Sequence, residues 1–184
     1  MANALAEALS VEEVSMMPCY DAVHKQGVGA SSKHRLNMLQ LALENDDLVN
    51  LDERECRRAE ASYTIDSLLE LRGEIGDEAL CLVVGADAAN GLSSWLRVEE
   101  FSKLTHVVVI GRPEVKNLTV NRVVIKEKLE LLGFSLAMSL SELKEISVGR
   151  FIFIDLPLLD ISSTYIRNRI KQGLSIRYLV TDAV

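Results

Sequence analysis

The stretch that decides the fold runs from Phe151-Ile152-Phe153-Ile154 to Ile161-Ser162-Ser163-Thr164-Tyr165-Ile166-Arg167. The first four residues form a continuous apolar run, which predicts a buried strand. The second segment opens a helical pattern that carries Ile166 and Ile170 on one face and closes at Gly173. A strand, a loop and a helix in this order form the geometry in which α/β proteins build nucleotide sites.

The beginning of this helix has the composition of an anion site. Ser162 suits the N-cap, where its hydroxyl can accept a hydrogen bond from a free backbone N–H. Arg167 lies four residues after Ser163, so both side chains can point the same way. A cation near the start of a helix gains nothing from the helix dipole, whose positive end lies there. Hydroxyls, free N–H groups and a guanidinium together favour a phosphate site over a capped helix with a solvated arginine.

Strand and helix patterns alternate along the rest of the chain, and residues 133–150 are the part with the weakest pattern. Strands are expected at 14–17, 48–51, 80–84, 107–110 and 151–155. Helices are expected at 2–9, from Ser31 to 44, from Ser62 or Thr64 to Ile75, at 94–102, at 121–132 and from 162. Leu80–Val84 is expected to be a central strand that is buried on both faces. The alternation predicts an α/β fold with a doubly wound parallel sheet, in one domain over residues 1–184.

The composition excludes several classes of function. With 184 residues, of which 48% are hydrophobic, the chain is long enough for a sizeable core. A net charge of −7 argues against non-specific binding to nucleic acid, whereas a small anion needs only a few local cations. The N-terminus has no signal-peptide pattern, and no uncharged apolar stretch is long enough to span a membrane.

Neither the cysteines nor the histidines have the spacing of a metal site. The three cysteines are odd in number and form no CxxC pair, which indicates reduced thiols and a cytoplasmic protein: Cys19, Cys56 and Cys81. The three histidines are scattered, so no metal site built by the protein is expected: His24, His34 and His106.

Ligands bind at the carboxyl ends of the strands in such sheets, and this rule selects further candidates. Gly85 and Asp87 follow strand 80–84, where the glycine lets a ligand approach closely and the aspartate could bond a ribose or merely cap a turn. Trp95 follows this turn and is either a core residue or a ligand platform. Arg112 follows strand 107–110 as a candidate anion clamp, or as an ordinary surface arginine. Lys25, with its neighbour His24, adds positive charge after strand 14–17, and Tyr63-Thr64 opens a helix with free N–H groups.

Five segments together resemble the bacterial nicotinate-nucleotide adenylyltransferases. Ile161–Arg167 is similar to the ISSTxIR signature of the nucleotidyltransferase superfamily. The resemblance narrows through four more segments in the same order and spacing: His34–Leu39, Ser62–Leu68, Gly85-Ala86-Asp87-Ala88 through Leu92 to Trp95, and Gly173–Val180. It covers nearly the whole chain and is weakest over residues 113–150. It implies a Rossmann-like nucleotidyltransferase fold that transfers the adenylyl group of ATP to nicotinate mononucleotide.

The resemblance also implies roles for the candidate residues. Gly85, Asp87 and Ile161 would lie by the adenosine, while Ser162, Ser163 and Arg167 would bind the ATP phosphates, with Arg167 acting in catalysis. Tyr63 and Thr64 would present backbone groups to the pyridine carboxylate. Trp95 would stack on the pyridine ring, Arg112 would help to hold that nucleotide, and Lys25 is a weaker addition. ATP and nicotinate mononucleotide would be the partners, and Mg²⁺ would arrive with ATP.

The sequence departs from the family pattern at both ends. The family begins with a strand and a GxFxPxHxGH segment, and none of the three histidines here has an HxGH context. A wrongly assigned start, a fragment and a true loss all remain open, as do an active enzyme and a catalytically inactive nucleotide-binding remnant. On this interpretation the domain is incomplete at both ends, and activity is expected to be very low. The slot beside strand 80–84 would be empty, and such an edge favours self-association.

Overall fold

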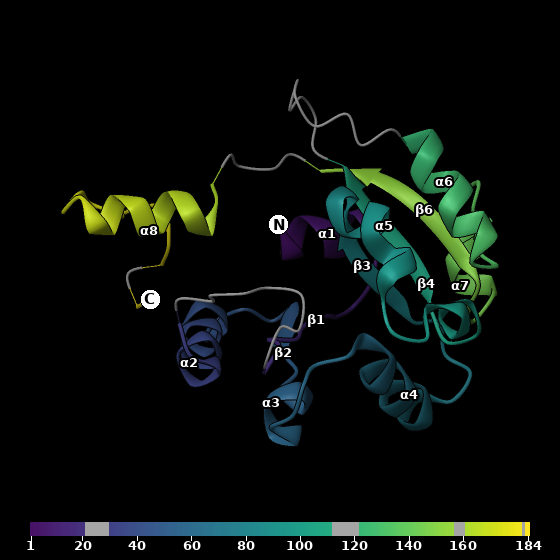
Figure 1. The fold of residues 1–184 in the computed structure, drawn as a ribbon, viewed down its shortest axis with the longest axis horizontal. Coiled ribbons are helices and arrows are strands. Elements are labelled where there is room, and N and C mark those ends of the chain that lie inside the picture. The colour runs from purple at the N-terminus through teal and green to yellow at the C-terminus, as the bar shows by residue number, and fades with distance from the viewer. Residues whose placement is uncertain (21–29, 112–121, 157–160, 182) are drawn as a thin grey trace. The chain divides into compact units, whose positions relative to one another are not determined.

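The computed structural model of the chain describes residues 1–20, 30–111, 122–156, 161–181 and 183–184. They form two compact units, which Figure 1 shows by chain position. The unit made of Met1–Ser62 and Leu158–Val184 is called the split unit, and the unit Tyr63–Pro157 is called the sheet unit. The single domain expected over residues 1–184 stays a prediction.

The sheet unit is built on four parallel strands in the order β3-β4-β6-β5. Their bounds are Cys81–Gly85 for β3, His106–Gly111 for β4, Arg150–Asp155 for β6 and Ser135–Leu136 for β5. The apolar run in β4 has both faces buried, since Val107, Val108 and Val109 are all inaccessible to solvent. This confirms the prediction of a buried strand at 107–110 and makes β4 the centre of the unit.

The prediction for residues 80–84 was partly wrong. β3 lies at the end of the strand order, and among its residues only Val84 is buried. An apolar run shows that a strand packs on something, but it does not say how many strands flank it, and the run in β4 has the same character. Within the described residues β4 is the only strand that pairs with β3.

Helices cover the sheet through a shared apolar core. α4 (Thr64–Ile75) contributes Ile65 and Leu68 to it, and α6 (Arg122–Leu131) contributes Ile125 and Leu129. α5 (Ala86–Gly91) packs beside α6, as Figure 1 shows, and α7 is Ser141–Glu145. The helix expected at 94–102 is instead two 3₁₀ turns, η1 (Leu92–Ser94) and η2 (Val98–Lys103). Arg97, between them, has a φ of 52°, a left-handed conformation that a continuous helix cannot contain.

Two side chains tie the loops at the amino ends of the strands. Arg72 donates hydrogen bonds to the backbone carbonyls of Gly76, Glu78 and Leu104, at 2.7, 2.7 and 2.6 Å. The buried His106 accepts a hydrogen bond from the Arg150 N–H at Nδ1 (3.0 Å). Its Nε2 lies 2.7 Å from the Ile146 carbonyl and must therefore carry the proton. Burial lowers the pKa of His106, so the ring is held neutral.

The split unit contains a second, two-stranded parallel sheet. β1 (Val14–Met16) pairs with β2 (Val49–Leu51), and neither strand pairs with the sheet unit in the described residues. The single sheet expected from the alternating pattern is therefore two sheets in the described residues, one in each unit. The helices of this unit are α1 (Ala2–Leu9), α2 (Ser32–Leu43), α3 (Arg54–Arg58) and α8 (Ser163–Lys171).

Capping and a single arginine fix the beginning of α2. The Ser31 hydroxyl accepts a hydrogen bond from the His34 N–H at 3.3 Å, which confirms the predicted cap. Arg35 donates to the carbonyls of Ala30 and Tyr20, at 2.7 and 3.0 Å, and so fastens the segment after β1 to this helix. No helix in the described parts of the chain has both the length and the apolar character that crossing a bilayer requires.

Candidate nucleotide-binding site

The beginning of α8 has the geometry predicted from its sequence. The Ser162 hydroxyl accepts a hydrogen bond from the Tyr165 N–H at 3.1 Å, so Ser162 is the N-cap. The helix ends before Gly173, whose φ of 69° is the left-handed conformation that glycine adopts without strain. Ser163, the first helical residue, is exposed, and Ile161, just before the cap, is half-buried. These positions leave hydroxyl and backbone N–H groups of the first turn accessible.

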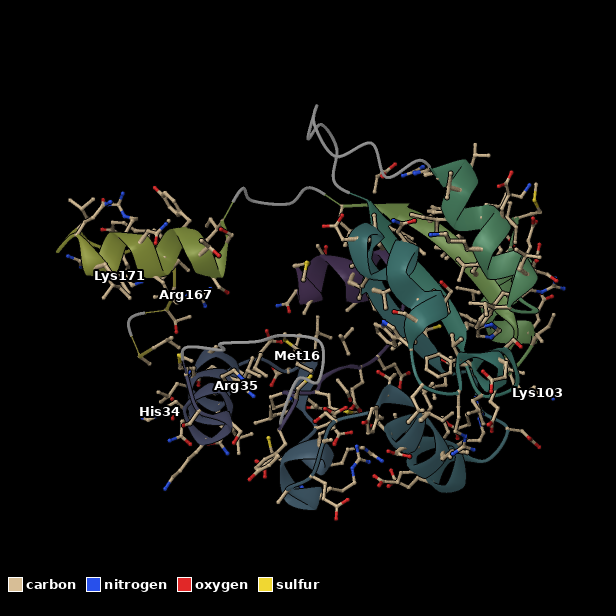
Figure 2. The ribbon with its side chains drawn as sticks, viewed as in Figure 1. Met16, His34, Arg35, Lys103, Arg167 and Lys171 are labelled. Carbon is tan, nitrogen blue, oxygen red and sulfur yellow. The ribbon has the colours of Figure 1, made fainter. Side chains whose placement is uncertain are left out.

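Arg167 and Arg169 lie on the same helix but differ in what they contact. The Arg169 guanidinium donates to the Ser175 carbonyl at 2.8 Å and lies 5.6 Å from the centre of the Tyr165 ring, so it holds the turn after the helix. Arg167 is exposed, and its only partner in the described residues is the Thr164 hydroxyl, at 3.4 Å. Figure 2 shows Arg167 and Lys171 along one side of α8. Of the two arginines, Arg167 is the one that is accessible to a ligand.

A cleft of about 660 Å³ lies within the split unit next to these residues. Its wall is mainly apolar, with Met38, Leu39 and Val180 among the lining side chains, and Ser163 and Arg35 add polar groups. The Arg35 guanidinium is already bonded to backbone carbonyls. Ser163 is therefore one polar group of this lining that remains available to a ligand, and Thr181 is another.

Gly85 and Asp87 lie at the carboxyl end of β3, as predicted. Gly85 is the exposed N-cap of α5, and no atom lies within 4 Å of the position that a Cβ would occupy there. Asp87 is exposed in the first turn of α5, and its carboxylate makes no hydrogen bond with the described residues. The cap interpretation of Asp87 is not supported, since α5 has no side-chain cap.

The residues assigned to the pyridine nucleotide lie on neighbouring elements of the sheet unit. Tyr63 is the N-cap of α4 and makes no side-chain cap, so the N–H groups around Thr64 lack that partner. Trp95 is half-buried and meets the fully buried Phe101 edge to face, with ring centres 6.2 Å apart. It is thus anchored in the core while part of its surface stays accessible.

Charges link α4 to the turn after Trp95. Arg97 donates two hydrogen bonds to the Glu100 carboxylate, at 2.7 and 2.8 Å. These bonds and, to a smaller extent, the Asp66 carboxylate in the first turn of α4 raise the pKa of Arg97. α4 also packs on η2, and Tyr63 and Trp95 both pack against the same apolar core.

The structure brings the predicted residues together in two groups, one in each unit. The sheet unit carries Tyr63, Thr64, Gly85, Asp87 and Trp95, and the split unit carries Ile161, Ser162, Ser163 and Arg167. Arg112 and Lys25, together with His24, lie outside the described residues.

One charged pair at the carboxyl edge of the four-stranded sheet was not predicted from the sequence. Arg122, the first residue of α6, forms an ion pair with Asp155, the last residue of β6. The signal that could have found it is the acidic residue that ends a buried strand, since strand ends point to the ligand side. Arg122 gave no such signal, because it lies where a helix was expected rather than beside a strand.

Metal and thiol chemistry have little support in the described residues. No group of three or more His, Cys, Asp or Glu side chains there is arranged to hold a metal ion. Burial raises the pKa of the Cys81 thiol to about 11, so it is protonated and unreactive at neutral pH.

Comparison with known proteins agrees with this geometry. A family model described as cytidylyltransferase-like matches residues 1–169. A probable nicotinate-nucleotide adenylyltransferase of Marinobacter nauticus is 39% identical over all of this chain and 83% of its own length. The corresponding protein of Hahella chejuensis is 40% identical over 94% of this chain and 77% of its own length.

A solved structure has the same fold at low sequence identity. It is the Plasmodium falciparum nicotinic acid mononucleotide adenylyltransferase complexed with NaAD, with a TM-score of 0.62 and 17% identity. The match covers 95% of this chain and 80% of that one. The chain therefore belongs to the cytidylyltransferase-like family and, within it, to the nicotinate-nucleotide adenylyltransferases. The recognition and the α/β parallel fold class predicted from the sequence are confirmed, and no finding supports the inactive alternative.

Proposed function

We propose that this protein transfers the adenylyl group of ATP to nicotinate mononucleotide, which yields nicotinate adenine dinucleotide and pyrophosphate. A phosphate oxygen of the mononucleotide attacks the α-phosphorus of ATP, and the bond from that phosphorus to the bridging oxygen of the β-phosphate breaks. Pyrophosphate leaves with the electron pair. The reaction needs positioning of two anions and stabilisation of charge more than it needs an acid or a base.

The observation that carries the proposal is the beginning of α8. It combines an N-cap serine, accessible N–H groups of the first turn and an exposed arginine whose one contact within the described residues is the Thr164 hydroxyl at 3.4 Å. In our proposal Ser162, Ser163 and Arg167 bind the ATP phosphates, and Arg167 stabilises charge on the departing pyrophosphate. In the sheet unit Gly85 and Asp87 contact the adenosine, where the open space at Gly85 allows a close approach.

The pyridine nucleotide is assigned to the sheet unit. The backbone around Tyr63 and Thr64 binds its carboxylate, because a helix start without a side-chain cap offers N–H donors to an anion. Trp95 stacks on the pyridine ring from its anchored position against Phe101. Arg112 and Lys25 are proposed to add positive charge for the same nucleotide.

Mg²⁺ enters with the ATP phosphates in this proposal, as part of the substrate. We also place the protein in the cytoplasm, because its three cysteines are odd in number and form no CxxC pair, which suits a reducing compartment. The apolar edge of β3 favours self-association, since unpaired strand edges invite another chain.

The test supplies the purified protein with ATP, Mg²⁺ and nicotinate mononucleotide. We expect nicotinate adenine dinucleotide and pyrophosphate in equal amounts by chromatography, and less product when cytidine triphosphate replaces ATP. Parallel calorimetry measures the binding of each nucleotide. Binding of both without any dinucleotide would return the inactive alternative, and binding of neither would refute the proposed site.

A further inference from the structure

We infer that Arg122 binds a phosphate group of a nucleotide substrate, where its ion pair with Asp155 lies over Gly111 at the carboxyl edge of the sheet. The inference rests on the proposed function and adds a residue to its site. Asp155 is the positioning residue that orients the guanidinium.

The placement follows from the register of three strands. Gly85 of β3 pairs with Ile110 of β4, and Gly111, the next residue, pairs with Asp155 of β6. Three parallel strands therefore end side by side, two of them in glycine. This is the edge at which open α/β sheets bind their ligands.

Gly111 makes room for the charged pair. A Cβ at this position would overlap Oδ1 of Asp155 and would lie 3.0 Å from Nη2 of Arg122. The φ of Gly111 is not in the left-handed region, so its backbone does not require glycine. Space for the pair is therefore the structural reason for a glycine at the end of β4.

Arg122 is oriented on two sides and accessible on another. Asp155 accepts its hydrogen bond, and its guanidinium carbon lies 5.3 Å from the centre of the Phe153 ring. Its side chain is nevertheless 52% exposed. Asp155 is its only hydrogen-bond acceptor among the described residues, so the Nε and Nη1 donors remain available to a ligand.

This arrangement contributes more to binding than to stability. An ion pair this exposed adds little to folding, because water screens it. A guanidinium already held in one orientation loses less entropy when it binds, and its planar fork suits two oxygens of a phosphate. The α-phosphate side of ATP and the phosphate of the mononucleotide share this chemistry, and the experiment distinguishes them.

The experiment compares Arg122→Gln, Arg122→Lys and the control Lys126→Gln. Lys126 lies one turn further along α6, with a similarly exposed ion pair to Glu130 at 3.8 Å, so its variant loses the same charge away from the strand ends. Binding of ATP alone and of nicotinate mononucleotide alone is measured by calorimetry, and folding by thermal melting. We expect Arg122→Gln to weaken binding of at least one ligand about 10-fold, and Arg122→Lys to recover part of it.

The ligand that loses affinity identifies the phosphate, and a loss for both assigns Arg122 to a place that both phosphates reach. Gly111→Ala should weaken the binding of the same ligand, because the added methyl group displaces the Arg122–Asp155 pair without removing a charge. Affinities of Arg122→Gln within twofold of Lys126→Gln for both ligands would overturn the inference. Since binding is measured without turnover, a protein that forms no dinucleotide but shows the Arg122 effect would refute the proposed reaction and retain the phosphate contact.

Discussion

β6 and α8 are successive elements of the chain and differ in burial: β6 carries a fully buried side chain, whereas no residue of α8 is buried. β6 carries Phe151, which is fully buried and meets Phe153 edge to face at 5.9 Å between ring centres. No residue of α8 is buried, and Ser163 and Arg167 are exposed. The strand is defined by the apolar surface that it removes from water, and the helix by the hydrogen-bonding groups that it leaves accessible. Stability and ligand binding are thus carried by separate elements, which mutations can affect separately.

The largest effect should come from the core. Phe151→Ala should lower the free energy of unfolding by about 3–5 kcal/mol, because it leaves a cavity among side chains that cannot fill it. The matched change on the other element is Ile170→Ala in α8, where the side chain is 56% exposed. Ile170→Ala should lower the free energy of unfolding by less than about 0.5 kcal/mol, apart from the small change in helix propensity. Urea unfolding of both variants checks this, and similar losses would end the contrast between strand and helix.

The next effect should appear only in binding. Arg167→Ala should weaken ATP binding by about 1.5–3 kcal/mol, because charge-assisted hydrogen bonds to phosphate are lost. The melting temperature should stay unchanged, since Arg167 makes one weak contact in the described residues. Lys171→Ala, one turn away on the same side of α8, is the control and should bind ATP normally. An unchanged ATP affinity for Arg167→Ala would return Arg167 to the role of a solvated surface residue.

The stability of the sheet unit should depend on pH through His106. Burial lowers the pKa of His106 in the folded protein, and the charges of Arg72 and Arg150 lower it further. Below about pH 6.5, His106 therefore binds a proton in the unfolded chain but stays neutral in the folded protein. Stability from this group is present above pH 6.5 and should fall as the pH decreases, with a slope of up to about 1.4 kcal/mol per pH unit.

Urea unfolding at several pH values between 7.5 and 5.5 measures this slope. His106→Gln should flatten it. An unchanged slope in this variant would mean that other groups cause it.

The smallest effect should be the response of Trp95. Its fluorescence should change with nicotinate mononucleotide rather than with ATP, and Trp95→Leu should cost about 0.5–1.5 kcal/mol of binding through lost stacking. It is the only tryptophan of the chain, so the signal has one source. A response to ATP alone would show that the two nucleotide pockets have been assigned the wrong way round.

The sequence predicted those elements that depend only on residues close together in the chain. Ser31 and Ser162 cap their helices as expected, because each hydroxyl needs only an N–H three residues ahead. The apolar runs at 107–110 and 151–154 are strands for an equally local reason. The position of β3 at the end of the order could not be predicted from its own residues, since pairing depends on what lies beside a strand.

For the site, too, the residues set by local rules were predictable and those set by tertiary contacts were not. Residues at strand ends and helix starts, such as Gly85, Asp87 and Ser163, follow from the strand–loop–helix pattern. The pair of Arg122 and Asp155 joins positions 33 residues apart, and only the register of β4 with β6 brings Gly111 beneath it. Contacts of this kind depend on tertiary structure, so the periodicity of apolar residues along the chain cannot predict them.

The division of the chain has a consequence for its synthesis. The sheet unit is one continuous segment, whereas the split unit needs residues from both ends of the sequence. A ribosome adds about 5–20 residues per second, starting at the N-terminus, so every residue of the sheet unit is synthesised before α8 is. The split unit can close only afterwards. A nascent chain that ends near Pro157 would hold the whole sheet while lacking the helix assigned to the ATP phosphates.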